Sequence, residues 1–269
     1  MRSGLKVLPL VGAGGLLAHL LTAAAFRRRT DAMIARLEHA SVAEVSKPPA
    51  PAIIQSFARR ALCKNPVPNT VWLSQCGEMR ANLRDPWRPF TAEQVISIHE
   101  PGFVWLARMQ AAPHLYAHIL DCYVGGEGLL EVRLFGSLRL ARAAGPQASR
   151  GELMRYLAEL PWAPHAMLHN PFLLWREIDP STVEVSAEST GGPARVRLIF
   201  ENGDVVRADA EDRPRLVGGR TIPTRWGAQC FDYREIDGCR VPTRAVVSWF
   251  LESGPFDYFR GSLTAWRLM

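Results

Sequence analysis

From residue 71 onward, hydrophobic and polar residues alternate in short runs that turn residues separate. This alternation is typical of strands with one buried face. Asn202-Gly203 is a strong signal for a β-hairpin turn, and Asp237-Gly238 marks a second turn. The pattern predicts antiparallel strands over 71–79, 90–99, 103–109, 117–123, 129–135, 138–143, 173–178, 182–189, 195–201, 204–209, 224–233, 241–251 and 258–268.

One stretch, 149–168, follows a helical period instead. Ser149 and Glu152 have the spacing of a capping box at a helix start, and Pro161 ends the helix by disfavouring helical dihedrals at Leu160. A second short apolar turn follows it. The helix has one apolar stripe, formed at the spacing i, i+3, i+4, i+7 by Leu153, Tyr156, Leu157 and Leu160.

The other face of this helix carries Glu152, Arg155 and Glu159, at spacings that allow ion pairs. Glu159 has two interpretations. It is a buried general acid whose pKa is raised by the neighbouring leucine and tryptophan, or an exposed partner of Arg155. The second is the more ordinary arrangement on a helix surface, and we favour it.

A sheet of ten or more strands must curl or close. With one main helix available, the expected fold is α+β, a large curved antiparallel sheet (a half-barrel) wrapped around that helix. Much of the inner surface is expected from Trp72, Trp105, Trp162, Trp175, Trp226 and Trp249. An apolar pocket is predicted between the helix and the sheet, because a helix of about ten residues, roughly 15 Å long, leaves part of the concave face uncovered.

The N-terminal run Val7 to Phe26 has no charged side chain and is followed by three arginines, 27–29. Three interpretations compete: a membrane-spanning helix, a cleaved signal peptide, and the glycine turn of a nucleotide-binding fold. We favour the spanning helix, because Leu17 occupies the third glycine position of the fingerprint and the arginines resist export. The expectation is a protein anchored in the cytoplasmic membrane, and the flanking charges favour a cytoplasmic body.

Between this segment and the sheet, the sequence predicts a linker. Its first part has a helical pattern, 47–51 is a stiff Pro-rich spacer, and 53–62 is a short amphipathic helix. The expected organisation is 1–29 membrane segment, 30–69 helical and Pro-rich linker, and 70–269 β-rich domain.

Composition narrows the function classes. The 269 residues are 48% hydrophobic, enough for a sizeable core, and the net charge is +6. The first 50 residues hold seven basic and three acidic side chains, so the body is nearly balanced and is not expected to bind nucleic acid. Cys230 and Cys239 flank a predicted hairpin and form either a disulfide or free thiols.

Familiar catalytic and cofactor motifs are absent. There is no G-x-S-x-G elbow, H-E-x-x-H helix, P-loop or EF-hand pattern, and no CxxC zinc spacing. His114 with His118 and His165 with His169 are four apart, but prolines interrupt both stretches. We therefore predict no metal and no cofactor.

Several polar residues remain as candidates for a cavity mouth: Arg108, Asp121, Glu159, Asp212, Arg213, Tyr233 and Arg244. Arg108 and Arg244 lie on predicted strands, where they point either inward to an anionic head group or outward to solvent. Asp212 and Arg213 precede a proline and are expected to form an ion pair at a strand end. The predicted ligand-binding residues are Arg108, Tyr156, Glu159, Trp162, Tyr233 and Arg244.

Five phrases of the chain, in the same order, resemble a bacterial family of unknown function over roughly residues 70–269. They are DPWRPFTAEQ (85–94), PGFVWLAR (101–108), GELMRYLAELPWAPHAML (151–168), AEDRPR (210–215) and FDYREIDGCRVPTRAVVSW (231–249). That resemblance implies no activity. The hairpin YREIDGCRVPT is more loosely similar to lipoprotein-carrier-like half-barrels, which implies a curved sheet and helices enclosing a cavity for acyl chains.

Two functions follow as hypotheses. The first is a membrane-tethered protein that holds a lipid or other apolar ligand in a half-barrel cavity. The second is a small-molecule enzyme that uses the same cavity, with Glu159 or Asp121 as acid or base and Tyr233 or an arginine stabilising negative charge. The scaffold does not decide between them, since an enzyme of tryptophan-pigment biosynthesis shares the carrier fold.

Overall fold

The computed structural model describes residues 7–40, 49–61, 67–112 and 115–269. All the strands pair in one 13-stranded antiparallel sheet, as the alternation predicted. They are β1 (Thr70–Met79), β2 (Arg88–Ser97), β3 (Phe103–Ala112), β4 (Leu115–Val124), β5 (Glu127–Leu134), β6 (Leu138–Ala144), β7 (Leu174–Asp179), β8 (Thr182–Ala187), β9 (Ala194–Glu201), β10 (Asp204–Val217), β11 (Arg220–Ile236), β12 (Cys239–Leu251) and β13 (Gly254–Leu268).

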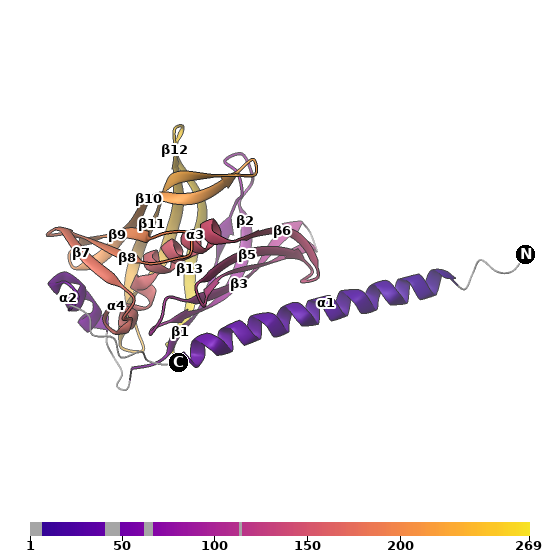
Figure 1. The fold of residues 1–269 in the computed structure, drawn as a ribbon, viewed down its shortest axis with the longest axis horizontal. Helices are drawn as coiled ribbons and strands as arrows, with labels where there is room; N and C mark the ends of the chain where they lie inside the picture. Colours follow the sequence, from indigo (N-terminus) through magenta and orange to yellow (C-terminus); the bar gives the residue numbers. More distant parts are fainter. Residues whose placement is uncertain (1–6, 41–48, 62–66, 113–114) are drawn as a thin grey trace, which may run out of the picture.

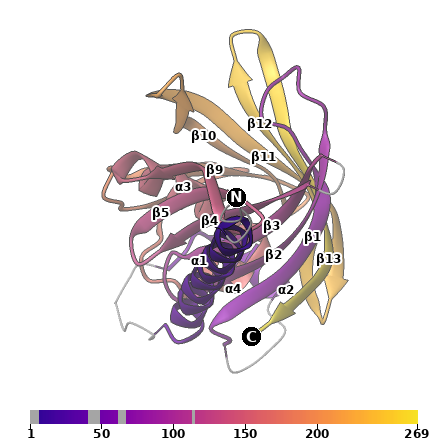
Figure 2. The ribbon, with the colours of Figure 1, turned by 90° about the vertical axis from the view of Figure 1, so that its right-hand side faces the viewer.

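The spatial order is β6-β5-β4-β3-β2-β1-β13-β12-β11-β10-β9-β8-β7. The first and last strands therefore pair at the centre, while β6 and β7, which follow one another in the chain, form the two edges. Their connection crosses the concave face as helix α3 (Pro146–Ala158), the 3₁₀ turn η1 (Leu160–Trp162) and helix α4 (Pro164–His169). Figures 1 and 2 show the sheet curling around α3, which confirms the predicted α+β half-barrel.

Curvature comes from irregular pairing and positive-φ turns. β-bulges interrupt the register at Ser74, between Ala210 and Arg213 in β10, and at Val247 in β12. The β9–β10 turn is the expected Asn-Gly hairpin, with φ of 52° at Asn202 and 81° at Gly203.

Helix α3 begins earlier than predicted. Pro146 occupies its first turn after Gly145, and no side chain caps it. Ser149 lies one turn inside the helix, where its hydroxyl accepts a hydrogen bond from the Gly128 amide at 2.9 Å. The expected capping box is therefore wrong, and Glu152 is free to point elsewhere. The apolar stripe is as predicted, since Leu153, Tyr156 and Leu157 are all fully buried.

The outer face of the sheet carries helix α1 (Val7–Glu38). Val95, Val104 and Leu120 point away from the α3 side, because neighbours along a strand face opposite ways. They form a separate core with Phe26 and Leu37 of α1. We expected the N-terminal part of α1 to span a membrane. Among the residues described here, no helix is long and apolar enough to cross one. Figure 1 shows this part of α1 extending away from the sheet.

Helix α2 (Ala52–Ala61) closes one end of the half-barrel near α4 and β12. Its Phe57 packs edge-on against Phe200 and Tyr233. Part of the predicted Pro-rich spacer, residues 47 and 48, lies outside the described residues. Cys230 is a free thiol opposite Ala245, so it does not bridge to Cys239, which is disulfide-bonded.

Candidate functional site

A cavity of about 830 Å³ lies between α3 and the concave face of the sheet. The strands supply most of its apolar wall, and one face of α3 supplies its charged wall. A volume of this size is typical of sites for small molecules. The apolar side chains that line it include Met79, Trp105, Leu130, Trp226, Trp249 and Phe259.

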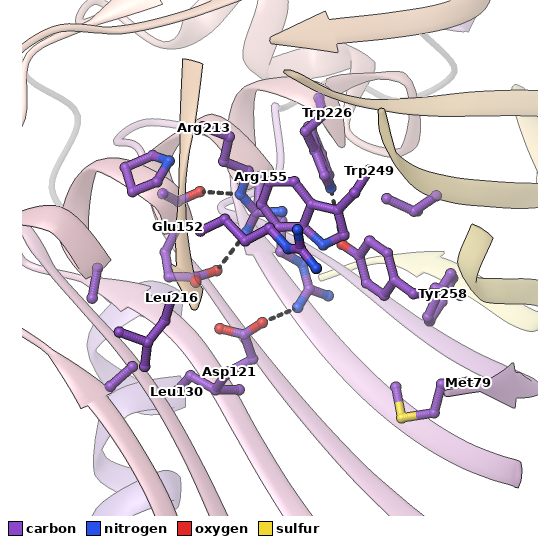
Figure 3. Close-up of a pocket in the computed structure, with 18 of the residues that line it drawn as sticks. Met79, Asp121, Leu130, Glu152, Arg155, Arg213, Leu216, Trp226, Trp249 and Tyr258 are labelled. Carbon is purple, nitrogen blue, oxygen red and sulfur yellow. Dashed lines mark hydrogen bonds and ion pairs between the residues drawn. The ribbon is translucent and has the colours of Figure 1, made fainter. Parts of the chain in front are cut away.

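Aromatic side chains from β11, β12 and β13 form one wall (Figure 3). Trp226 donates its indole N–H to the Tyr258 hydroxyl at 2.9 Å, and Trp249 stacks on Tyr258 with ring centroids 6.1 Å apart. The bulge between β12 and β13, where Tyr258 is the extra residue of β13, helps to place Trp249 opposite Phe256. Because the Trp226 N–H already has a partner, the surface offered to the cavity is the apolar ring.

The charged wall is built around Arg155, which is buried between two carboxylates. Its Nη1 contacts Asp121 of β4, and its Nε donates to Glu159 at 2.8 Å. Its guanidinium also lies 5.0 Å from the Trp105 ring centroid. Burial alone would lower the pKa of Arg155, but the charges of Glu159 and Asp121 outweigh it and raise that pKa above its usual value.

Glu152 lies one turn earlier on the same face of α3 and is 8% exposed. Burial raises the pKa of its carboxyl well above the usual value, the negative charge of Asp121 adds to this, and the charge of Arg213 opposes it. Glu152 therefore holds its proton to a higher pH than an exposed glutamate does. A carboxyl with a raised pKa beside a second carboxyl, that of Asp121, is the site's unusual chemical feature.

Arg213 comes from the bulge of β10 and points toward Glu152 (Figure 3). Its Nε donates to the Gly151 carbonyl at 3.1 Å, and its Nη2 lies 3.5 Å from Glu152 Oε2. The ion pair expected between Asp212 and Arg213 is absent, because the bulge sends their side chains apart: Asp212 pairs with Arg150 at 2.6 Å.

Of the six predicted ligand-binding residues, Glu159 and Trp162 line the cavity. Glu159 pairs with Arg155 as expected, although its side chain is only 12% exposed. Tyr156 does not line the cavity: it is fully buried in the main core, where its hydroxyl donates to the Ser97 carbonyl at 3.0 Å.

The other three predicted residues lie elsewhere. Arg108 stacks over Tyr116, with 3.8 Å from its guanidinium carbon to the ring centroid. Tyr233 donates its hydroxyl to the Val205 carbonyl at 2.8 Å, and Arg244 is an exposed partner of Asp232 at 3.1 Å. The structure does not bring them to the cavity mouth. Arginines that line the cavity instead are Arg80, Arg142 and Arg215.

Glu152 and Arg155 could not be found from the sequence as site residues, because polar positions on a helix ordinarily face solvent. Four of the six tryptophans expected on the inner surface do line the cavity: Trp105, Trp162, Trp226 and Trp249. Trp72 packs on the outer core instead, and Trp175 packs against the edge of the main core.

The histidine pairs do not form a site in the part of the chain that the structure describes. His165 is buried in α4, where burial and the charge of His169 lower its pKa to about 4. His114 lies outside the described residues. No group of three potential metal ligands occurs among the residues described.

Comparison with known proteins places most of the chain in one sequence family. The model of a family of unknown function (DUF6544) matches residues 40–261. The resemblance inferred from the five phrases is thereby confirmed. No curated protein matches the chain in sequence.

Two solved structures are similar in overall shape. One is a LolA superfamily protein from Nitrosomonas europaea, with a TM-score of 0.43 and 13% identity over 83% of this chain and 94% of the other. The second is a putative outer membrane lipoprotein-sorting protein domain from Vibrio parahaemolyticus, with a TM-score of 0.42 and 8% identity over 81% of this chain and 91% of the other. The sequence analysis also noted a resemblance to lipoprotein-carrier-like half-barrels, and both of these structures are of that kind. At these TM-scores we draw nothing about function from it.

Proposed function

We propose, for a chain that belongs to this family of unknown function, that it is a binding protein for a lipid or other apolar ligand in its half-barrel cavity. The single observation that carries the proposal is the aromatic wall of Trp226, Trp249 and Tyr258 facing a cavity of about 830 Å³. Apolar surface of this extent is costly to leave in contact with water.

The composition of the wall favours binding of an alkyl chain over binding of a polar metabolite. In the aromatic wall, the Trp226 indole N–H is satisfied by the Tyr258 hydroxyl. Glu152, Arg155 and Arg213 gather on α3 and β10, so the cavity has an aromatic wall and a charged wall. Such a division suits an amphiphile.

The second candidate is an enzyme, and the carboxyl pair favours it. Glu152, whose pKa is raised, lies beside a second carboxyl, Asp121, and such a pair can donate and accept a proton. One variant distinguishes the two functions. Glu152→Gln keeps the shape of the side chain and removes its acidic proton, so it should preserve binding of an apolar ligand and abolish acid catalysis.

We also propose that the N-terminal helix attaches the protein to the cytoplasmic membrane. Its exposed leucines, each between 53% and 59% accessible, are Leu16, Leu17, Leu20 and Leu21. Arg27 and Arg28 follow them and are exposed, which suits anionic lipid head groups. Full-length protein that fails to float with anionic liposomes would rule this out.

Binding is tested with an environment-sensitive apolar dye. Ala228 of β11 lines the cavity, whereas Ala265 of β13 is exposed, so Ala228→Phe and Ala265→Phe are a matched pair. The dye should bind the unmodified protein at one molecule per chain, Ala228→Phe should weaken binding at least about tenfold, and Ala265→Phe should leave it unchanged. Equal binding by both variants would place the dye outside the cavity.

A further inference from the structure

We propose that the ligand of this cavity is an amphiphile with one anionic head group, a carboxylate or a phosphate, and that Arg213 holds this group. The inference rests on the proposed function and names the class of ligand. It starts from the position and the charge partners of one side chain.

Arg213 is placed by an irregularity in the sheet. Ala210 pairs with Trp226 and Arg213 with Thr224, so β10 has one more residue than β11 across this interval. A bulge re-aims the side chains near it. Here it brings the guanidinium 4.4 Å from the Trp226 ring centroid, with only 7% of Arg213 exposed. The charge therefore sits inside the cavity, against its aromatic wall.

None of the described acidic residues of the cavity forms a hydrogen-bonded ion pair with Arg213. Asp121 and Glu159 both pair with Arg155. Glu152 is the carboxyl nearest to Arg213, but 3.5 Å is too long for a hydrogen bond, and Glu152 Oε2 is buried without a hydrogen-bond partner. Burial raises the pKa of the Glu152 carboxyl, so this group gives up its proton, and becomes a counter-ion for Arg213, less readily than an exposed glutamate. Among the described residues, Arg213 has no other carboxylate partner.

A buried guanidinium without a hydrogen-bonded counter-ion is unfavourable, and an anion within reach stabilises it. Carboxylate and phosphate oxygens accept two parallel hydrogen bonds from the guanidinium fork. While the Glu152 carboxyl holds its proton, it can donate a further hydrogen bond to the same anion. A head group held there would let an alkyl tail lie along Trp226, Trp249 and Tyr258, because the Arg213 guanidinium lies against the Trp226 ring (Figure 3).

The test compares three ligands that share a tail. Dodecanoic acid, dodecyl phosphate and dodecanol compete with the apolar dye on the full-length protein at pH 7.5. We expect the acid or the phosphate, whichever head group fits, to bind at least about tenfold more tightly than the alcohol. If the alcohol equals both anions, the assignment to Arg213 is wrong. If none of the three displaces the dye, the proposed function itself fails.

Two variants test whether Arg213 causes the preference for an anionic head group. Arg213→Met removes the charge and keeps much of the side-chain volume, so it should abolish the preference for the anion and leave dodecanol binding unchanged. Arg244→Met removes an exposed arginine outside the cavity and should keep the preference. A preference that survives in Arg213→Met would overturn the assignment. If Arg213→Met does not fold, the comparison of the three ligands on the unmodified protein still decides the charge of the head group.

Discussion

Helix α3 has one face packed in the main core and another that borders the cavity, and the two are built differently. On one, Leu153, Tyr156 and Leu157 pack into the main core with no exposed surface. On the other, Glu152 and Arg155 border the cavity. The core face is stabilised by close packing and by the hydrogen bonds of the Tyr156 hydroxyl. The cavity face is instead held by ion pairs between side chains of α3, β4 and β10. The difference shows where the fold leaves room for a ligand.

The cavity face is the more costly to maintain. Two carboxylates, those of Asp121 and Glu159, accompany Arg155, and the negative charge of Asp121 adds to the effect of burial in raising the pKa of Glu152. Such networks are often no more stable than apolar packing of the same volume. A charged wall is therefore weak evidence for a stabilising role, and it is consistent with a functional one.

The largest effect should follow from removing Arg155. Arg155→Met leaves Asp121 and Glu159 as buried acids without their common partner. We expect a loss of about 3–5 kcal/mol in the free energy of unfolding, measured by urea denaturation at pH 7.5. A loss below about 1 kcal/mol would mean that the carboxyls are well solvated, and the contrast between the two faces would disappear.

A somewhat smaller loss is expected on the core face. Leu157→Ala removes a fully buried side chain and should destabilise the protein by about 2–5 kcal/mol. Dye binding at saturation should be unchanged wherever the variant is folded, because Leu157 does not line the cavity. A change in dye affinity without a change in stability would contradict the separation of the faces.

The most gradual effect, which accumulates with each pH unit, should be the pH dependence that Glu152 contributes. A carboxyl whose pKa is raised on folding costs stability as the pH rises above its unfolded value, because the folded state holds the proton more tightly. Glu152→Gln removes this cost, so its stability relative to the unmodified protein should increase by up to about 1.4 kcal/mol per pH unit above about pH 4.3. Urea denaturation at pH 5 and pH 8 measures this, and a constant difference would show that Glu152 is ionised throughout.

The strands were predictable where they alternate and are bounded by turn residues, whereas the long strands β10 and β11 extend well beyond the predicted ranges 204–209 and 224–233. The errors at α3 have a physical cause as well. Gly145-Pro146 marks a helix start, but Ser149 and Glu152 also fit a capping box, and the tertiary contact of Ser149 with Gly128 decided between them.

The site was harder to predict than the fold. Trp162 and Glu159 could be placed near it from their position at the end of the helix. Arg213 stood out only as one of several polar candidates, since its direction depends on a bulge that the alternation does not reveal. Glu152 and Arg155 read as a solvent face because a helix pattern does not distinguish water outside the protein from a cavity inside it.

The central claim is that the half-barrel holds an amphiphile, and native mass spectrometry of gently extracted full-length protein tests it most directly. We predict a species heavier than the bare chain by the mass of one amphiphile, and a loss of that species in Ala228→Phe but not in Ala265→Phe. Only the bare mass in every sample, with no uptake of added dodecanoic acid, dodecyl phosphate or dodecanol, would contradict the claim.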